Sequence, residues 1–139
     1  MKNCIYFLLF PLLLGCSEPE DITNRAFLLT GENSKSWQLT TINVNGGADK
    51  IPLDCESDDV ETFHANNSYI YSHGNKSCSN QGNKNGKWNL NDDFITLDIN
   101  YNDDSYLPNQ FKIVHLDESK LVLEQIVFDK VLLTYLLVD

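Results

Sequence analysis

The sequence is short of basic residues. It has 10 Lys and Arg against 20 Asp and Glu, which gives a net charge of −10. A nucleic-acid-binding surface needs basic side chains opposite the phosphates, so this balance argues against DNA or RNA as a partner. An anionic membrane surface would also repel the chain, so the protein surface alone does not explain any attachment to a bilayer.

Catalytic and metal-binding motifs are missing as well. The chain has no G-x-S-x-G motif, no P-loop spacing and no C-x-x-C spacing, and its three histidines are scattered. The acidic pairs Asp58-Asp59, Asp92-Asp93 and Asp103-Asp104 do not suit acid–base catalysis, because neighbours on a strand point to opposite faces. The two later pairs lie in Asn-rich segments typical of turns. We therefore predict no enzyme, no cofactor and no metal site.

The chain also lacks an apolar run of the ~20 residues that a membrane span needs. Its N-terminal run, Ile5 to Leu14, is broken by Pro11 and follows a single positive charge at Lys2, which is typical of a secretory signal peptide. The end of the run, Leu13-Leu14-Gly15-Cys16, resembles the lipobox of bacterial lipoproteins. The resemblance implies cleavage after Gly15 and acylation of Cys16.

This reading divides the chain into three parts: a signal peptide at 1–15, the acylated cysteine and its tether at 16–27, and a domain at 28–139. Acyl chains on Cys16 would hold the protein stably at a membrane, since each buried CH₂ contributes about 0.8 kcal/mol. Ser17 is not the aspartate that tends to retain lipoproteins in the inner membrane, so we expect an outer-membrane location. Pro19 interrupts the acids that would resemble a surface-export signal, so the periplasmic and surface faces both stay open.

Two cysteines remain in the mature chain, Cys55 and Cys78. An even pair in an exported, oxidising compartment predicts a disulfide. The alternative, two thiol ligands of a metal, lacks a suitable spacing and a nearby pair of histidines.

The mature chain shows strand-like runs at short intervals, separated by Asn, Asp and Gly, and no long helical period. A short helical turn is expected at Ile22–Leu29, ending near Gly31. In "FITLDINY", Ile95, Leu97, Ile99 and Tyr101 alternate with polar residues, as in a half-buried strand. The expected strands are Trp37–Asn45, Lys50–Leu53, Val60–His64, Tyr69–His73, Gly86–Leu90, Phe94–Tyr101, Gln110–Leu116, Leu121–Phe128 and Val131–Val138.

Two details of the strands bear on the fold. In "SWQLTTINVNG", the apolar side chains change face near Thr40-Thr41, which predicts a bulge or strong bend of the kind that a closed sheet requires. "FHANNSYIY" predicts a hairpin around Asn66-Asn67. A two-residue loop would pair Phe63 with Ile70 and a bulged three-residue loop would pair it with Tyr69, and the sequence does not decide between them.

These segments together resemble the lipocalin-like domain of small bacterial lipoproteins. The similarity covers about Leu28 to Val138, and its most specific parts are Cys55, Asp58-Asp59 and Phe63, followed by Cys78 and Gly86-Lys87-Trp88. It implies an all-β fold, an up-and-down antiparallel barrel of about eight strands with a short N-terminal helical turn. The inward aromatic side chains would either fill the barrel, which is the usual case in small barrels, or line a cavity. The candidate cavity residues are Trp37, Phe63, Trp88, Phe94, Tyr101 and Phe111.

Two functions follow as hypotheses. The first is a lipid-anchored monomer that binds a small apolar ligand in the barrel. The second is an interaction protein that docks another protein through its loops, as lysozyme inhibitors do, with the acidic charge suited to a basic target. A cavity in the folded barrel would favour the first hypothesis, and a packed interior with a protruding loop would favour the second.

Overall fold

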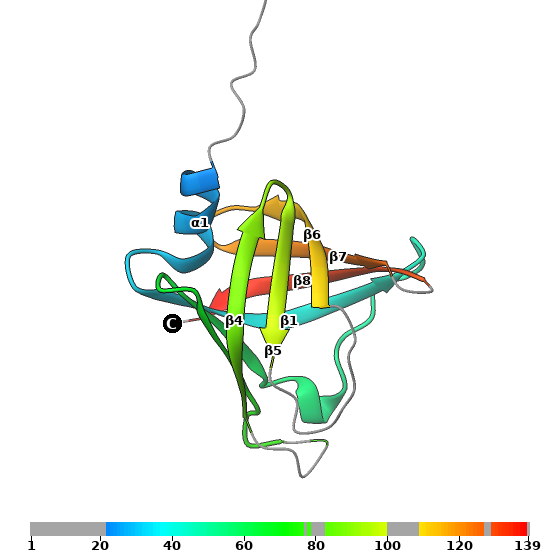
Figure 1. Ribbon diagram of the computed structural model, residues 1–139. Coiled ribbons are helices and arrows are strands. Elements are labelled where there is room, and N and C mark those ends of the chain that lie inside the picture. The colour runs from blue at the N-terminus through cyan, green and yellow to red at the C-terminus, as the bar shows by residue number, and fades with distance from the viewer. Residues whose placement is uncertain (1–21, 77, 79–82, 100–108, 127–128, 139) are drawn as a thin grey trace, which may run out of the picture.

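The computed structural model describes residues 22–76, 78, 83–99, 109–126 and 129–138. Each strand pairs antiparallel with the next along the chain, and β8 pairs back onto β1, so the sheet closes into a barrel (Figure 1). The elements are α1 (Ile22–Thr30), β1 (Ser34–Val44), the 3₁₀ turn η1 (Asp54–Glu56), β2 (Val60–His64), β3 (Ser68–Ser72), β4 (Lys84–Asn91), β5 (Phe94–Ile99), β6 (Asn109–Leu116), β7 (Lys120–Ile126) and β8 (Lys130–Val138).

The predicted fold class is confirmed: an eight-stranded up-and-down barrel preceded by a short helix. One predicted strand, Lys50–Leu53, is wrong. Lys50 makes only an isolated bridge to Ile42, and the segment after it has no strand structure. Pro52 explains the difference, because proline has no N–H to donate to a ladder. Among the described helices, none is long and apolar enough to cross a membrane.

The predicted bulge in β1 is present. Leu39 pairs with Tyr135 and Thr41 with Thr134, so Thr40 is the extra residue on the β1 side. A single extra residue reverses the alternation of side chains after it. Ile42 therefore comes to lie on the same interior side as Leu39, whereas strict alternation would have put the two on opposite faces. This bulge shapes the pocket described below.

The hairpin between β2 and β3 has the bulged three-residue loop. Phe63 pairs with Tyr69, and the loop closes with a hydrogen bond from the Asn67 backbone N–H to the His64 carbonyl at 3.0 Å. Asn67 has a φ of 66°, the left-handed conformation that this loop needs and that Asn tolerates better than most residues. This register brings Phe63 and Tyr69 together inside the barrel, with ring centroids 5.2 Å apart.

Helix α1 closes one end of the barrel. Its main contacts are with β1, β2, β4 and β6, and it lies on the opposite side of the molecule from η1 (Figure 1). The indole N–H of Trp37 donates to the carbonyl of Leu29 at 3.0 Å, and both residues are fully buried. Arg25 donates to the carbonyl of Asp92 and forms an ion pair with Asp93 in the β4–β5 turn. The helix begins inside the segment predicted as a tether, and its end at Thr30 is followed by Gly31 with a φ of 61°.

Candidate functional site

Three of the aromatic residues predicted to line a cavity are instead packed in the core. Trp37 and Phe63 have no exposed surface and Trp88 is 5% exposed. The Phe63 and Trp88 rings meet edge to face with centroids 6.2 Å apart, and the Trp88 indole N–H donates to the His64 carbonyl at 2.8 Å. These three side chains fill the half of the barrel next to α1 as an ordinary packed core.

The remaining candidates lie apart from this group. Phe94 is 40% exposed at the start of β5, and Phe111 is partly buried against the core. Tyr101 lies outside the described residues. None of the five described candidates belongs to the lining of the barrel pocket that the structure describes.

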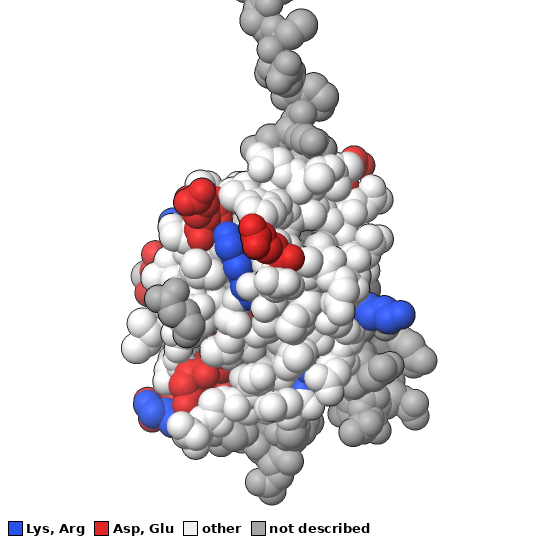
Figure 2. Space-filling model, turned by 90° about the vertical axis from the view of Figure 1, so that its left-hand side faces the viewer, with Lys and Arg blue, Asp and Glu red and all other residues white. Residues whose placement is uncertain are grey.

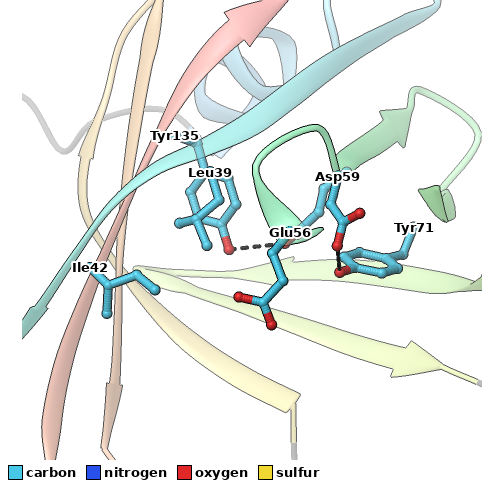
Figure 3. Close-up of a pocket in the computed structure, with 7 residues that line it drawn as sticks. Leu39, Ile42, Glu56, Asp59, Tyr71 and Tyr135 are labelled. Atoms are coloured by element: carbon cyan, nitrogen blue, oxygen red, sulfur yellow. Dashed lines mark hydrogen bonds between the residues drawn. The ribbon is translucent and has the colours of Figure 1, made fainter. Parts of the chain in front are cut away.

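That pocket has a volume of about 250 Å³ (Figure 3). Part of the interior is therefore empty, although the sequence favoured a filled core. Seven residues line it: Leu39 and Ile42 from β1, Glu56 from η1, Asp59 just before β2, Glu61 from β2, Tyr71 from β3 and Tyr135 from β8. Figure 3 shows the Glu56 side chain between Ile42 on one side and Tyr71 on the other.

Two acidic side chains point into the pocket because side chains alternate between the two faces of β2. Asp59, Glu61 and Phe63 are two positions apart, so they share one face of the strand. Because Phe63 is fully buried inside the barrel, the two acids on its face must also point inward. Asp59 is 5% exposed. Glu61 keeps partial exposure, and since it lines the pocket we assign that exposure to the pocket.

Tyrosine hydroxyls from two other strands donate hydrogen bonds to these carboxylates. The Tyr135 hydroxyl donates to Glu61 Oε1 at 2.9 Å, and the Tyr71 hydroxyl donates to Asp59 Oδ2. The Gly74 backbone N–H also donates to Asp59 Oδ1 at 3.2 Å. A buried carboxylate without such donors would be costly, so these hydrogen bonds are what allow two acids inside the barrel.

The barrel changes the ionisation of these groups. Burial is the largest cause of the raised pKa of Glu61, and the nearby charge of Asp59 adds to it, while hydrogen bonds from Tyr135 and Tyr69 act in the opposite direction. Burial also raises the pKa of Tyr71 and of Tyr135, and the adjacent carboxylates raise both further. The two hydroxyls therefore remain protonated hydrogen-bond donors at neutral pH.

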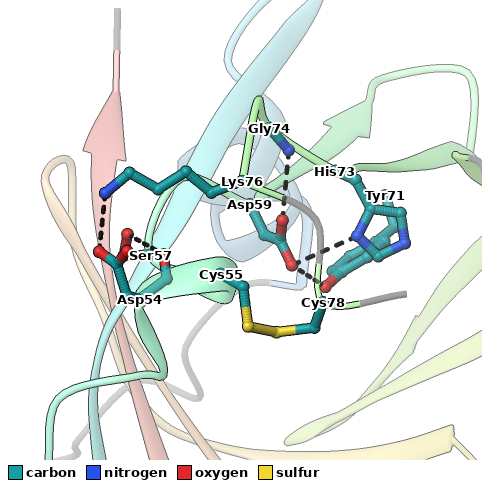
Figure 4. Close-up of a disulfide and its surroundings, with 9 residues drawn as sticks. All are labelled: Asp54, Cys55, Ser57, Asp59, Tyr71, His73, Gly74, Lys76 and Cys78. Atoms are coloured by element: carbon teal, nitrogen blue, oxygen red, sulfur yellow. Dashed lines mark hydrogen bonds and ion pairs between the residues drawn. A yellow bond between two sulfur atoms is a disulfide. The ribbon is translucent and has the colours of Figure 1, made fainter. Parts of the chain in front are cut away.

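The disulfide holds the third acid of the pocket in place. Cys55 and Cys78 are bonded with their Cα atoms 4.9 Å apart, which confirms the predicted pair. The bond links η1, which carries Glu56, to the segment after β3 (Figure 4). Lys76 forms an ion pair with Asp54 at 2.7 Å across the same junction.

A hydrogen bond to Asp58 also links these two segments. The Asn75 backbone N–H donates to Asp58 Oδ2 at 2.7 Å. Asp58 and Asp59 thus act separately: Asp58 holds the loop, and Asp59 faces the pocket. The adjacent pair that the sequence presents is divided between two roles, as expected for neighbouring residues that point in opposite directions.

No Lys or Arg lines the pocket as the structure describes it. Two basic residues lie close to lining residues: His73 Nδ1 is 3.5 Å from Asp59 Oδ2, and Lys84 Nζ is 5.7 Å from the centre of the Tyr71 ring. On the outer face shown in Figure 2, acidic side chains form separate groups with basic side chains beside them. The described lining therefore contains three acidic side chains and no Lys or Arg, with His73 beside Asp59.

The arrangement does not form a metal site. Among the described residues, no three His, Cys, Asp or Glu side chains are grouped closely enough to hold a metal ion. The carboxyl groups instead surround an open volume with one apolar wall, Leu39 and Ile42. Such a mixture of apolar lining and few polar groups is typical of sites for small organic ligands.

The comparisons with known proteins agree with this fold. Residues 34–123 match the sequence profile of the lipocalin-like domain family, which is generally non-enzymatic. No curated protein sequence matches the chain. A crystal structure of a lipocalin-like protein from Bacteroides uniformis superposes with a TM-score of 0.53 at 18% identity, over 76% of this chain and 96% of the other.

A second solved structure, an uncharacterized protein from Bacteroides eggerthii, has a TM-score of 0.50 at 19% identity, over 71% of this chain and 95% of the other. At these identities the two likenesses concern the fold alone. The match to the family profile extends from the first residue of β1 into β7, which is well over half of the chain. The chain belongs to the lipocalin-like domain family.

Proposed function

We propose that the protein is a lipid-anchored outer-membrane lipoprotein whose barrel binds a small ligand. The observation that carries the binding function is the pocket of about 250 Å³ inside the barrel. The lipocalin-like fold is compatible with this role. The lipobox-like Leu13-Leu14-Gly15-Cys16 supports the anchor, because acyl chains on Cys16 would keep the barrel at the membrane without a spanning segment.

The pocket limits the ligand in size. Its volume lies below the ~300–1,000 Å³ of sites that hold drug-sized molecules, so the enclosed part of the ligand is small. The expectation of an apolar ligand suits the wall made by Leu39 and Ile42, but the opposite side carries carboxyl and hydroxyl groups. A ligand that fills the pocket therefore has an apolar part and a polar part.

A pocket-filling variant tests this function. In Leu39→Trp, the larger side chain would occupy the pocket, while Leu136→Trp adds the same group on β8 at a position that is 45% exposed and outside the lining. Each anchored protein is extracted under mild conditions and its bound small molecules are identified by native mass spectrometry. We expect a bound mass in the wild type and in Leu136→Trp that is lost in Leu39→Trp.

The same bound mass in all three proteins would contradict binding in the pocket. Circular dichroism and urea unfolding of the two variants show whether each retains the barrel. If Leu39→Trp does not fold, Ile42→Phe takes its place, because Ile42 lines the same wall from the other side of the bulge.

A protein-docking role is the second candidate. The observation in its favour is the loop before η1, where Ile51 is 85% exposed and Leu53 is 64% exposed. Pro52 between them is buried, so the loop is held to the barrel while its two apolar neighbours project outward. Crosslinking in cells with a photoreactive residue at position 51 tests this role. A specific crosslinked protein that is lost in Leu53→Ser would support it, and crosslinks to lipid or solvent alone would contradict it.

A further inference from the structure

The geometry of the pocket points to its ligand class: we propose that it binds a small organic cation, an amine with a compact apolar body. This inference rests on the proposed ligand-binding function and names the chemistry of the ligand. The ammonium group would lie among Glu56, Asp59 and Glu61, and the apolar body would lie against Leu39 and Ile42.

The charge of the lining favours a cation. Three of the seven lining residues are acidic and none is Lys or Arg. Carboxylates gathered in a site of reduced dielectric repel one another and any anion, and they attract a cation more strongly than they would in water. An anionic ligand would have to enter against all three acids, so the pocket excludes it.

One carboxylate of the lining has no partner among the residues that the structure describes. Asp59 and Glu61 accept hydrogen bonds from Tyr71 and Tyr135. In the part of the chain that the structure describes, no hydrogen bond or ion pair reaches the carboxylate of Glu56, which lines the same pocket. An acceptor held in a pocket by the neighbouring disulfide, without a protein donor, is available to an N–H donor of a ligand.

The lining suits an organic cation better than a metal ion. The described acids are not grouped as metal ligands, and two of the lining residues are the aliphatic Leu39 and Ile42. A bare ion would leave this apolar wall and most of the 250 Å³ without contact. An amine contacts both sides of the pocket, because its N–H groups donate to the carboxylates and its carbon atoms pack against the aliphatic side chains.

Binding of an amine is coupled to the proton of Glu61. Burial raises the pKa of Glu61, and a neighbouring ammonium would favour the ionised form. An amine therefore displaces a proton from Glu61 at a pH where the carboxyl is protonated in the free protein. Among the described residues, the titratable groups that interact with Glu61 are Asp59, Tyr69, Tyr71 and Tyr135, and Glu56 lines the same pocket.

Isothermal titration calorimetry tests the inference on the full folded chain in detergent. The probes are primary amines from propylamine to 2-phenylethylamine, each paired with the alcohol and the carboxylate of matching carbon skeleton. At least one amine is expected to bind roughly 10-fold or more tightly than its alcohol, and its carboxylate is expected not to bind. Substitutions Glu56→Gln and Glu61→Gln keep the size of the side chains and should each weaken the amine by roughly 10- to 100-fold.

The control is Glu118→Gln, an exposed acid in the turn after β6, which should leave the affinity unchanged. Equal binding of amines and alcohols, or an amine affinity unaffected by both pocket substitutions, would overturn the cation inference. If at the same time Leu39→Trp loses a co-purified molecule, the ligand-binding function stands and only the ligand class is wrong. If no probe binds and Leu39→Trp changes nothing, both proposals fail.

Discussion

Loss of the Cys55–Cys78 disulfide is expected to lower the free energy of unfolding by about 3 kcal/mol. The two cysteines are 23 positions apart in the sequence. In the chain-entropy model, a crosslink over such a loop restricts the unfolded chain by about 3.4 kcal/mol at 25 °C. The ion pair of Lys76 with Asp54 and the hydrogen bond from Asn75 to Asp58 do not involve the sulfur atoms, so we expect the folded loop to keep its position and the loss to come from the unfolded state.

Urea unfolding measures this loss. Trp37 and Trp88 are both buried, so their fluorescence changes when the barrel opens. With an m-value of about 2 kcal/mol/M, the midpoint of the double variant Cys55→Ser, Cys78→Ser should fall by about 1.5 M urea. Wild-type protein in reductant is the matched control and should unfold at the same concentration as the variant. Equal midpoints for the oxidised, reduced and substituted proteins would refute the reasoning.

Three further predictions concern other parts of the chain. Glu61 has a raised pKa in the folded barrel, so its contribution to stability is present below about pH 4.5, its unfolded value, and is lost as the pH rises through the folded value. At pH 8, Glu61→Gln should therefore have a higher urea midpoint than wild type, and its free energy of unfolding should be higher by about 1.4 kcal/mol for each pH unit between the two pKa values. Identical pH profiles of the two proteins would contradict this. Asn67 has a positive φ, so Asn67→Ala should cost about 1–2 kcal/mol and Asn67→Gly should cost less, as checked by thermal unfolding; equal losses would show that the loop conformation is not the cause. Cys16→Ala should abolish incorporation of a labelled fatty-acid analogue in cells, and labelled variant protein would contradict the lipobox interpretation.

Strand alternation made most of the barrel predictable. The limits of β2 match the predicted Val60–His64, and Ile95 and Leu97 are buried while Phe94 and Thr96 are exposed. Their burial follows directly from a period of two. The bulge was predictable for the same reason, because the apolar face changes at Thr40-Thr41. The failed strand at Lys50–Leu53 shows that apolar composition alone does not make a strand where Pro52 removes a ladder donor.

The candidate site was less predictable, because the aromatic residues that suggest a cavity lie in the core or at its edge, whereas acidic residues line the pocket. Trp37, Phe63 and Trp88 are buried in the packed core next to the helix, and none of them belongs to the lining of the described pocket. The useful signal was in β2, where Asp59 and Glu61 share the face of Phe63. Considered only as the adjacent pair Asp58-Asp59, these acids were excluded from catalysis because neighbours on a strand point to opposite faces.

The partners of these acids could not be identified from the sequence. Tyr135 reaches Glu61 from 74 positions away, and Tyr71 reaches Asp59 from the neighbouring strand. Their positions depend on the register of the closed barrel, which places β8 beside β1 and β1 beside β2. Local patterns do not specify which inward residues of distant strands meet, or where the interior stays empty.

The most direct test of the central claim is a crystal structure of the protein with a bound amine from the titration series. We expect density inside the barrel, with the ammonium nitrogen within hydrogen-bond distance of Glu56, Asp59 or Glu61 and the carbon skeleton against Leu39 and Ile42. An amine bound outside the barrel, or one whose nitrogen points away from the three carboxyl groups, would contradict it.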